Sequence, residues 1–436
     1  MNRILTILER MEELPIEQVA ICVLAAVLLL AFTPRRFYLA LSIIFFVTWI
    51  NISRHPGLGV VAAIAKATYW LPSLLIIIAA LFHEGPRRRV PPLYWIYLVM
   101  PFWAAICIAT TVDRELGLLY QLNFFLSVLV ALLTIRTVVD TKSLSYVFTS
   151  FFVGLLIPFG ICVYAFLDGG SQHYHIARFS PFGSGTNQVV PLLVQVMALG
   201  TYQFQALRRL SLKIASLAVV GIAAALLLRT GSRQGTALVV IAFLPYCLLL
   251  IRRPIYMVLF TLVVASGLYW VFQTAADEAM IGRTTDFSNT GGRLPVALEY
   301  LGIFFERPAG GLLGTSNYSI ISDPTASAHP HNAYMELLYW GGASLAFPLF
   351  FLVIATLYSV GRTFWNRHRL NMGIEQLALV GSTLLAIYMH GLVSVMMYTS
   401  ISSWPFLHFL LSGLFLALSY DISLAKLRER ELGLEA

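Results

Sequence analysis

Long, continuous apolar runs dominate the chain, and short polar connections separate them. Runs of about 17–25 apolar residues match helices that cross a bilayer, whereas membrane β-strands alternate apolar and polar positions over about ten residues. The pattern therefore predicts an all-α, polytopic membrane bundle that forms one domain over residues 1–436. Thirteen stretches are candidate spans: roughly residues 16–33, 37–52, 57–83, 92–112, 117–135, 144–167, 187–207, 212–229, 235–251, 254–275, 339–361, 375–398 and 404–420.

Composition supports the same class. The 436 residues are 58% hydrophobic and 11% charged, and the mean hydropathy is +0.79. Soluble domains are about half apolar and a quarter charged, so this chain lacks the polar surface of a water-soluble globule. The four cysteines lie inside apolar stretches without metal-ligand spacing. Lys66 and Pro72 interrupt the third run, so the span count is least certain over the first 83 residues.

Basic residues indicate the orientation of the bundle. By the positive-inside rule, the side that collects lysine and arginine is the cytoplasm. The clusters on that side are Arg87 to Arg89, Arg136 with Lys142, Arg208 and Arg209 with Lys213, Arg252 and Arg253, Arg362 with Arg367 and Arg369, and Lys426 with Arg428 and Arg430. The opposite side then receives residues 113–116, 168–186, 230–234, 276–338 and 399–403.

The segment of residues 276–338 is the only connection long enough to fold by itself. Within it, residues 292–306 predict a helix on the membrane surface, with Pro295 near its first turn. Residues 331–339 predict a second helix that leads into the next span, with Asn332 as its N-cap. A loop of this length in a compact protein is usually functional, so we expect the chemistry on this side.

Arginines gather on this outer side, where the positive-inside rule expects few cations. Arg178, Arg233 and Arg293 lie in the glycine-rich sequences RFSPFGSG, TGSRQG and NTGGR. Guanidinium forks match phosphate oxygens, and glycines let the backbone approach a bulky ligand, so these three predict a diphosphate site. Arg229 and Arg307 are interpreted as helix caps or contacts to lipid headgroups.

The positions of histidine and acidic residues limit which kinds of catalysis or transport fit the sequence. His173, His175, His329 and His331 form two H-x-H pairs on the outer side, but this spacing is weak evidence for zinc, and we expect neither a metal nor a cofactor. One neutral imidazole suffices as a general base. None of the 21 acidic residues lies in the middle of a predicted span, which disfavours a cation-coupled transporter. The buried polar residues Lys66, Gln195 and His390 are interpreted as helix–helix contacts.

The order of the motifs resembles the O-antigen ligase family, within the larger group of O-antigen ligases, O-antigen polymerases and protein O-oligosaccharyltransferases. The resemblance covers about residues 90–420. Its motifs are RFSPFGSGTN from Arg178, GSRQG from Gly231, GGR ending at Arg293, PAGGLLG from Pro308 and HNAYMELLYWGG from His331.

The resemblance implies a membrane glycosyltransferase of the Gram-negative inner membrane, with twelve spans and a large periplasmic loop. Such ligases transfer a polysaccharide from undecaprenyl diphosphate to a sugar of lipid A-core without metal. It implies that Arg178, Arg233 and Arg293 are the essential arginines and that His331 is the essential histidine. Further candidates from the same motifs are Gly183, Asn187, Ser232, Asn332 and Tyr334.

Three alternatives remain open at this point. An O-antigen polymerase has the same external arginines but uses two undecaprenyl-linked substrates. A protein O-oligosaccharyltransferase usually carries extra C-terminal sequence, and a chain of 436 residues is short for one. A flippase or exporter of lipid-linked glycans predicts cations deep within spans, whereas here the cations lie at the span ends.

Overall fold

The computed structural model is helical in nearly all the residues that it describes. These are residues 37–52, 70–108, 114–168, 179–181, 186–250, 258, 262, 293–306, 308, 332–370, 372–392 and 403–431. Its helices follow in the order α3 (Phe37–Ile52), α5 (Trp70–Leu81), α6 (Tyr94–Ile108), α7 (Arg114–Thr137), α8 (Thr141–Leu167), α9 (Thr186–Ala206), α10 (Leu210–Arg229), α11 (Arg233–Leu250), α14 (Arg293–Glu306), α15 (Ala333–Trp365), the short 3₁₀ helix η4 (Arg367–Arg369), α16 (Ile374–Gly391) and α17 (Ser403–Glu431).

The helices have the lengths and composition expected of membrane spans. Within the described residues, five are long and apolar enough to cross a bilayer: Thr141–Leu167, Val189–Ala206, Leu210–Arg229, Gly341–Trp365 and Pro405–Glu429. Three shorter apolar helices accompany them: Pro72–Leu81, Tyr94–Ile106 and Gln121–Thr137. The all-α class is confirmed, while the number of twelve spans stays a prediction.

Local sequence explains where several helices begin. Asp140 precedes α8 and accepts a hydrogen bond from the Ser143 amide, while the Ser143 hydroxyl accepts one from the Asp140 amide. This reciprocal capping box satisfies amide groups that would otherwise lack partners at a helix start. The predicted helix of residues 292–306 is present as α14, and Asn332 caps α15 as predicted.

One helix is longer than the span predicted within it. α17 continues to Glu431, beyond the predicted span of residues 404–420. Charged side chains end the apolar run after residue 420, but the helix continues because some of them find partners. α15 has two helical parts that meet at a kink at Gly342, in the order predicted for residues 331–339 and 339–361.

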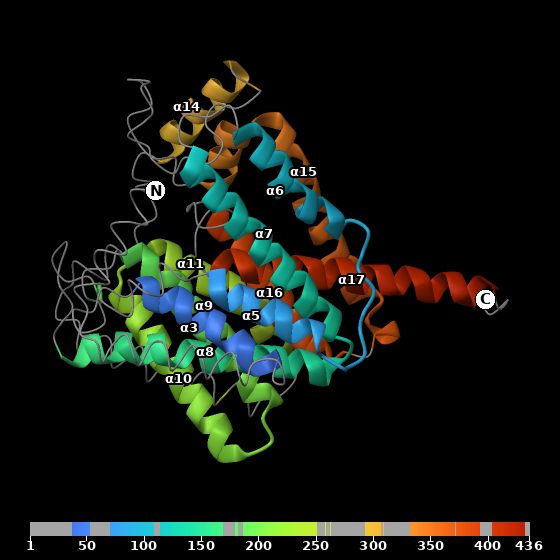
Figure 1. The fold of residues 1–436 in the computed structure, drawn as a ribbon. Helices are drawn as coiled ribbons and strands as arrows, with labels where there is room; N and C mark the ends of the chain where they lie inside the picture. Colours follow the sequence, from blue (N-terminus) through green and yellow to red (C-terminus); the bar gives the residue numbers. More distant parts are fainter. Residues whose placement is uncertain are drawn as a thin grey trace, which may run out of the picture.

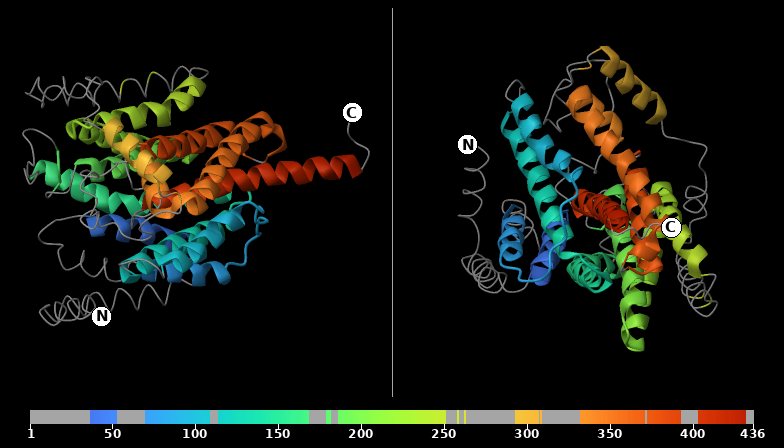
Figure 2. Two further views of the ribbon diagram at one scale, coloured as in Figure 1. Left: turned by 90° about the horizontal axis from the view of Figure 1, so that it is seen from above. Right: turned by 90° about the vertical axis from the view of Figure 1, so that its right-hand side faces the viewer.

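α17 occupies the middle of the assembly and contacts α3, α7, α15 and α16. Figures 1 and 2 show this helix in red, with its C-terminal part projecting beyond the other helices. α3 lies along α8, and α9 lies against both α8 and α10. A Cβ atom at Gly154 would clash with the Ser42 carbonyl oxygen, so only glycine permits this approach of α8 to α3.

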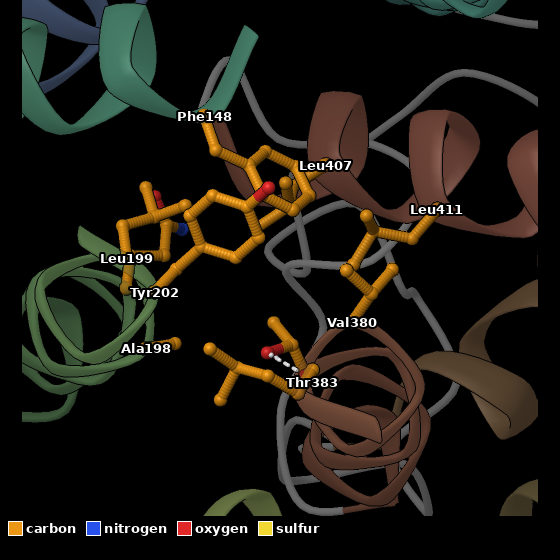
Figure 3. Close-up of a pocket in the computed structure, with 10 residues that line it drawn as sticks. Phe148, Ala198, Leu199, Tyr202, Val380, Thr383, Leu407 and Leu411 are labelled. Carbon is orange, nitrogen blue, oxygen red and sulfur yellow. Dashed lines mark hydrogen bonds between the residues drawn. The ribbon is translucent and has the colours of Figure 1, made fainter. Parts of the chain in front are cut away.

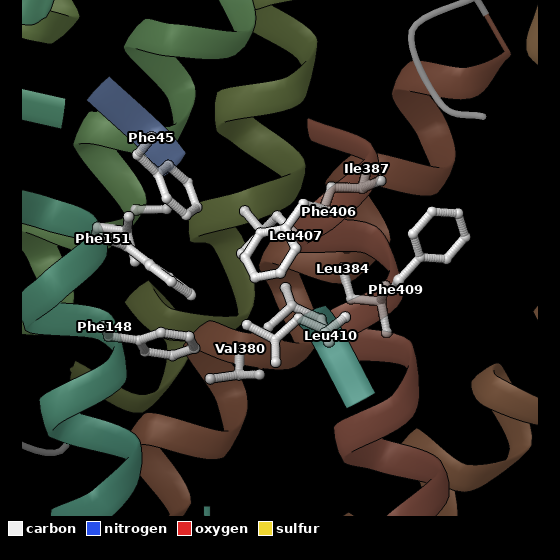
Figure 4. Packing of buried hydrophobic residues seen from close by; sticks show 14 of the residues in the cluster. Phe45, Phe148, Phe151, Val380, Leu384, Ile387, Phe406, Leu407, Phe409 and Leu410 are labelled. Atoms are coloured by element: carbon white, nitrogen blue, oxygen red, sulfur yellow. The ribbon is translucent and has the colours of Figure 1, made fainter. Parts of the chain in front are cut away.

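Aromatic and branched side chains fill the space between α3, α8, α16 and α17 (Figure 4). The ring centroids of Phe45 and Phe151 are 4.3 Å apart, and Phe406 on α17 lies edge-on to both rings at 5.9 and 5.6 Å. Val380 and Leu384 of α16 line the same space. This packing fixes α17 as the axis on which the other helices are arranged.

The two ends of the bundle are built differently. The basic end comprises the connections of residues 82–93, 138–140 and 366–373 and the C-terminal part of α17. There Arg88 pairs with Asp421 at 2.6 Å, and Arg369 pairs with Glu429. The motif end comprises two groups of contacting residues, 179–181 with 229–235 and 293–306 with 332–342. α15 and α16 each run between the basic end and the second of these groups.

Candidate functional site

The structure describes the predicted site residues to different extents. The side chains of Ser232, Asn332 and Tyr334 are described. For Asn187, Arg233 and Arg293, the structure describes the backbone within α9, α11 and α14. Arg178, Gly183 and His331 lie outside the described residues.

A tight turn between α10 and α11 places Arg233. Gly231 has a φ of 57°, a left-handed conformation that favours glycine. The Ser232 hydroxyl accepts a hydrogen bond from the Gly235 amide at 3.2 Å and so caps α11. Ser232 is 3% exposed. This hydrogen bond of Ser232 therefore stabilises the first turn of α11, which begins at Arg233.

The segment after Arg178 lies against this turn. The Phe179 amide donates a hydrogen bond to the Arg229 carbonyl at 2.8 Å, and both Phe179 and Ser180 are buried. Arg229 ends α10, and its guanidinium lies 5.7 Å from the centre of the Phe166 ring. Two arginine motifs that are distant in sequence thus meet at one place.

The start of α9 joins the same place. A Cβ atom at Gly235 would lie 3.2 Å from Val190 of α9 and 2.9 Å from Leu227 of α10. The absent side chain therefore lets the first turn of α11 pack closely between the two neighbouring helices. Asn187, the second residue of α9, is carried to this end of the bundle.

Two predicted site arginines lie at helix starts. Arg233 and Arg293 are the first residues of α11 and α14, respectively. The N-terminus of a helix carries about +0.5 of an elementary charge, and a cation there is unfavourable for the helix itself. The positive end of the helix and the arginine together favour phosphate or another anion at each of these two starts.

Asn332, the residue after His331, is held in place as the N-cap of α15. The Asn332 side-chain oxygen accepts hydrogen bonds from the Tyr334 and Met335 amides at 3.0 and 3.2 Å. The Tyr334 hydroxyl donates to the Tyr388 carbonyl at 3.0 Å, which joins the start of α15 to the last turn of α16. Burial raises the pKa of the Tyr334 hydroxyl, so it remains protonated as this bond requires.

α14 packs on the first turns of α15 (Figure 1). The Tyr300 and Tyr339 ring centroids are 5.0 Å apart, and Phe304 is buried with Leu338 and Ala346. Two apolar residues of α14, Leu298 and Phe305, remain exposed on the helix. α14 therefore has one face on α15 and a second apolar face that the described residues leave open.

A glycine bend links the large loop to the bundle. Gly342 has φ 58° and ψ −169°, a conformation that is essentially limited to glycine. The next amide, that of Ala343, donates to the Pro308 carbonyl at 2.9 Å. The Trp103 indole of α6 donates to the Ser344 hydroxyl at 3.1 Å. The bend therefore anchors both the loop after α14 and α6.

The structure adds a buried carboxylate that the sequence interpretation did not select. Glu336 lies in the first turn of α15 and is 3% exposed. Burial, with smaller contributions from Tyr339, Glu299 and Glu336, raises the pKa of Tyr300 to about 12. Tyr300 therefore stays a hydrogen-bond donor at neutral pH. An acidic residue in a first turn usually stabilises the helix dipole, which is why its position in the HNAYME motif gave no signal.

One small cavity lies between α8, α9, α16 and α17 (Figure 3). Its volume is about 10 Å³, room for one water molecule at most. Gln195, Tyr202 and Thr383 supply its polar edge, and the Thr383 hydroxyl donates to the Leu379 carbonyl at 2.8 Å. The interior location of Gln195 agrees with a helix–helix contact. His390 is also fully buried, and Lys66 lies outside the described residues.

Metal binding has no support among the residues that the structure describes. No group of three or more histidine, cysteine or acidic side chains in that part of the chain has the arrangement of a metal site. Both H-x-H pairs lie outside it, so their role stays a prediction.

The functional assignment depends on the motifs and on the geometry of the motif end. Comparison of the sequence with protein-family models gives no match, and comparison with curated proteins gives none.

Proposed function

We propose that the chain is a membrane glycosyltransferase of the O-antigen ligase type. It transfers an O-antigen polysaccharide from undecaprenyl diphosphate to lipid A-core at the periplasmic face of the inner membrane. The reaction is inverting and needs no metal. Arg178, Arg233 and Arg293 bind the diphosphate, and His331 is the general base.

One observation supports this proposal most directly. The hydrogen bond between the Phe179 amide and the Arg229 carbonyl joins the residues that follow Arg178 to the turn that precedes Arg233. A diphosphate carries its charge on several oxygens, so it needs two or more guanidinium groups from different segments. The contact between these two backbone segments supports a site that the motifs of Arg178 and Arg233 share.

The chemistry follows from the two kinds of residue. A hydroxyl oxygen of the acceptor sugar attacks the anomeric carbon of the donor while the bond from that carbon to the phosphate oxygen breaks. The hydroxyl proton passes to the neutral imidazole of His331. Undecaprenyl diphosphate leaves as an anion, whose added charge the arginines stabilise in the transition state. One displacement without a covalent intermediate inverts the anomeric configuration.

Two lipid-linked substrates must enter such a site from the bilayer. The exposed Leu298 and Phe305 give α14 an apolar face that suits the membrane surface. Its other face packs on α15, directly after the predicted base. α14 is therefore suited to position a lipid-anchored sugar beside the motif end.

The interior of the bundle favours an enzyme over a flippase. Among the described residues, Arg88 is the only buried cation, and it lies in a connection at the basic end. The cavity between α8, α9, α16 and α17 holds about 10 Å³. A flippase needs a polar path for sugars through the span region, and neither of these features provides one.

Transfer by the purified protein tests the proposal. The full chain is incubated with undecaprenyl-diphosphate glycan and lipid A-core, and a gel shift of the acceptor measures the product. A second reaction contains donor alone, in which a polymerase would lengthen the glycan. A third supplies an acceptor protein in place of lipid A-core. We expect product in the first reaction only. Product confined to the second or third reaction would replace the ligase by the corresponding activity.

A further inference from the structure

A second cationic site lies at the basic end, far from the proposed transfer site. An open pocket of about 320 Å³ separates the connection of residues 82–93 from the C-terminal part of α17. Four arginines and one carboxylate line it, together with apolar side chains. Its lining residues are Arg87, Arg88, Arg89, Val139, Asp421, Leu424, Ala425 and Arg428.

Arg88 is the buried arginine of this pocket, and each of its side-chain nitrogens has a partner within the fold. Its Nε donates to the Val138 carbonyl at 2.7 Å and one Nη to the Val139 carbonyl at 3.3 Å, while the other Nη pairs with Asp421 at 2.6 Å. The Arg88 amide also donates to the Arg136 carbonyl at 2.7 Å. Asp421 thus neutralises Arg88 and attracts Arg89 more weakly, so a single carboxylate faces the four guanidiniums of the pocket.

The remaining arginines are exposed at the rim. Arg87 donates to carbonyls at the end of α5, including that of His83 at 2.9 Å. Arg89 and Arg428 are exposed and have no hydrogen bond or ion pair to any other described residue. Like charges this close repel one another unless an anion lies between them. The pocket therefore has the charge and geometry to receive an anion.

Two nearby carboxylates have partners of their own. Asp140 caps α8 through Ser143, and Glu429 pairs with Arg369 on the connection after α15. Neither lines the pocket. An anion from outside the chain can therefore occupy it.

Apolar residues beside the pocket indicate the kind of anion. Leu81 and Phe82, at the end of α5, are exposed by 63% and 67%, and Leu427 precedes Arg428 on α17 with 52% exposed. A free anion would leave this apolar surface exposed, whereas the acyl chains of a lipid would cover it. Basic pockets at the end of membrane helices bind the phosphate groups of anionic lipids in this way.

We propose that this pocket binds the phosphate of an anionic phospholipid headgroup at the membrane surface. Arg89 and Arg428 hold the phosphate from opposite sides, and Arg87 adds charge from the end of α5. Arg88 keeps the two sides of the pocket together through Asp421. This inference does not depend on the proposed transferase activity.

Lipid binding to the full chain tests the proposal. The protein in a neutral detergent is titrated with short-chain phosphatidylglycerol, short-chain phosphatidylcholine or inorganic phosphate, and native mass spectrometry measures bound lipid. The test variant carries Arg89→Ala and Arg428→Ala. The control carries Arg208→Ala and Arg209→Ala, two exposed arginines of the α9–α10 connection outside the pocket.

We expect phosphatidylglycerol to bind the wild type more tightly than phosphatidylcholine, and the test variant to lose roughly tenfold in phosphatidylglycerol affinity. The control should keep the wild-type affinity. Equal losses in both variants would show a general basic surface and overturn the proposal. So would the absence of a headgroup preference, or displacement of the lipid by inorganic phosphate at equal concentration.

Discussion

The basic end and the motif end use arginine in opposite ways. At the basic end, Arg88 is buried and donates its hydrogen bonds to backbone carbonyls and to Asp421. At the motif end, Arg233 and Arg293 begin helices, where a cation opposes the helix dipole. The contacts that hold the motif end together come from elsewhere: a serine cap, an asparagine cap, glycine turns and aromatic rings.

This difference predicts whether a substitution should affect stability or glycan transfer. An arginine that completes the hydrogen bonding of the fold contributes to stability. An arginine that makes no stabilising contact in its helix is available for a ligand, and its presence there lowers the free energy of unfolding. Changes at the basic end should therefore alter the free energy of unfolding, and changes at the motif end should alter glycan transfer.

The largest effect should come from His331→Ala. We expect transfer to fall by about 10²–10⁴-fold, because the acceptor hydroxyl loses its general base. Donor binding should persist, since the arginines hold the diphosphate. In the wild type, the imidazole must be neutral to accept a proton. The rate should therefore fall as the pH drops through about 6.5, the ordinary imidazole pKa, and level off above it. Transfer rates between pH 5 and 8 measure both effects.

His329→Ala is the matched control for this prediction. His329 precedes Pro330, which disfavours helical backbone for the residue before it, so we expect the two imidazoles to point in different directions. We expect a much smaller loss of transfer in this variant. Equal losses in the two alanine variants, or a rate independent of pH, would contradict the role of His331.

Arg233→Lys should reduce transfer by roughly 10²–10³-fold, because lysine keeps the charge but loses the planar fork that binds two phosphate oxygens. The free energy of unfolding should stay close to that of the wild type, since the turn before α11 depends on Ser232 and Gly231. Arg229→Lys, four residues earlier on α10, is the control and should transfer at a near-normal rate. Wild-type turnover in the Arg233→Lys variant would remove the diphosphate role.

The sequence predicts local features of the fold well. Asn332 as an N-cap and residues 292–306 as a helix follow from side-chain chemistry within a few residues, and both are present. Hydropathy locates α8, α9 and α10 within a few residues of their ends. It does not reveal that α17 continues to Glu431, because the acidic residues after residue 420 pair with Arg88 and Arg369, which are distant in sequence.

The candidate site is predictable only in part, for the same reason. The glycine-rich arginine motifs are visible in the sequence, but the bond between Phe179 and Arg229 joins segments far apart in the chain and leaves no local pattern. Glu336 gives no signal because a first-turn acid has an ordinary role in any helix. Its burial depends on the packing of α14 against α15, which only the tertiary structure supplies.

At the basic end, Arg88→Ala should lower the free energy of unfolding by about 2 kcal/mol, because it leaves Asp421 and two carbonyls without their donor. Thermal unfolding in detergent measures this loss. Arg89→Ala, at the next residue, removes an exposed side chain that makes no described hydrogen bond, and it should leave the unfolding temperature nearly unchanged. Transfer per folded molecule should be normal in both variants. A large loss of transfer in a stable Arg88→Ala protein would break the separation between the two ends.

The smallest effect should come from Tyr334→Phe, which tests whether a motif-end residue can be structural. The Tyr334 hydroxyl donates to the Tyr388 carbonyl in the last turn of α16, where carbonyls lack an amide partner within the helix. Its loss should cost about 1 kcal/mol of unfolding free energy.

Tyr358→Phe on the same helix, whose side chain is 68% exposed, is the control and should change nothing. If Tyr334 only fixes the start of α15 against α16, turnover per folded molecule in Tyr334→Phe should stay within about threefold of the wild type, since that corresponds to less than about 1 kcal/mol of transition-state energy. A loss of turnover beyond about tenfold with unchanged stability would instead assign the hydroxyl to the substrate. The motif end would then use tyrosine, as well as arginine and histidine, for transfer.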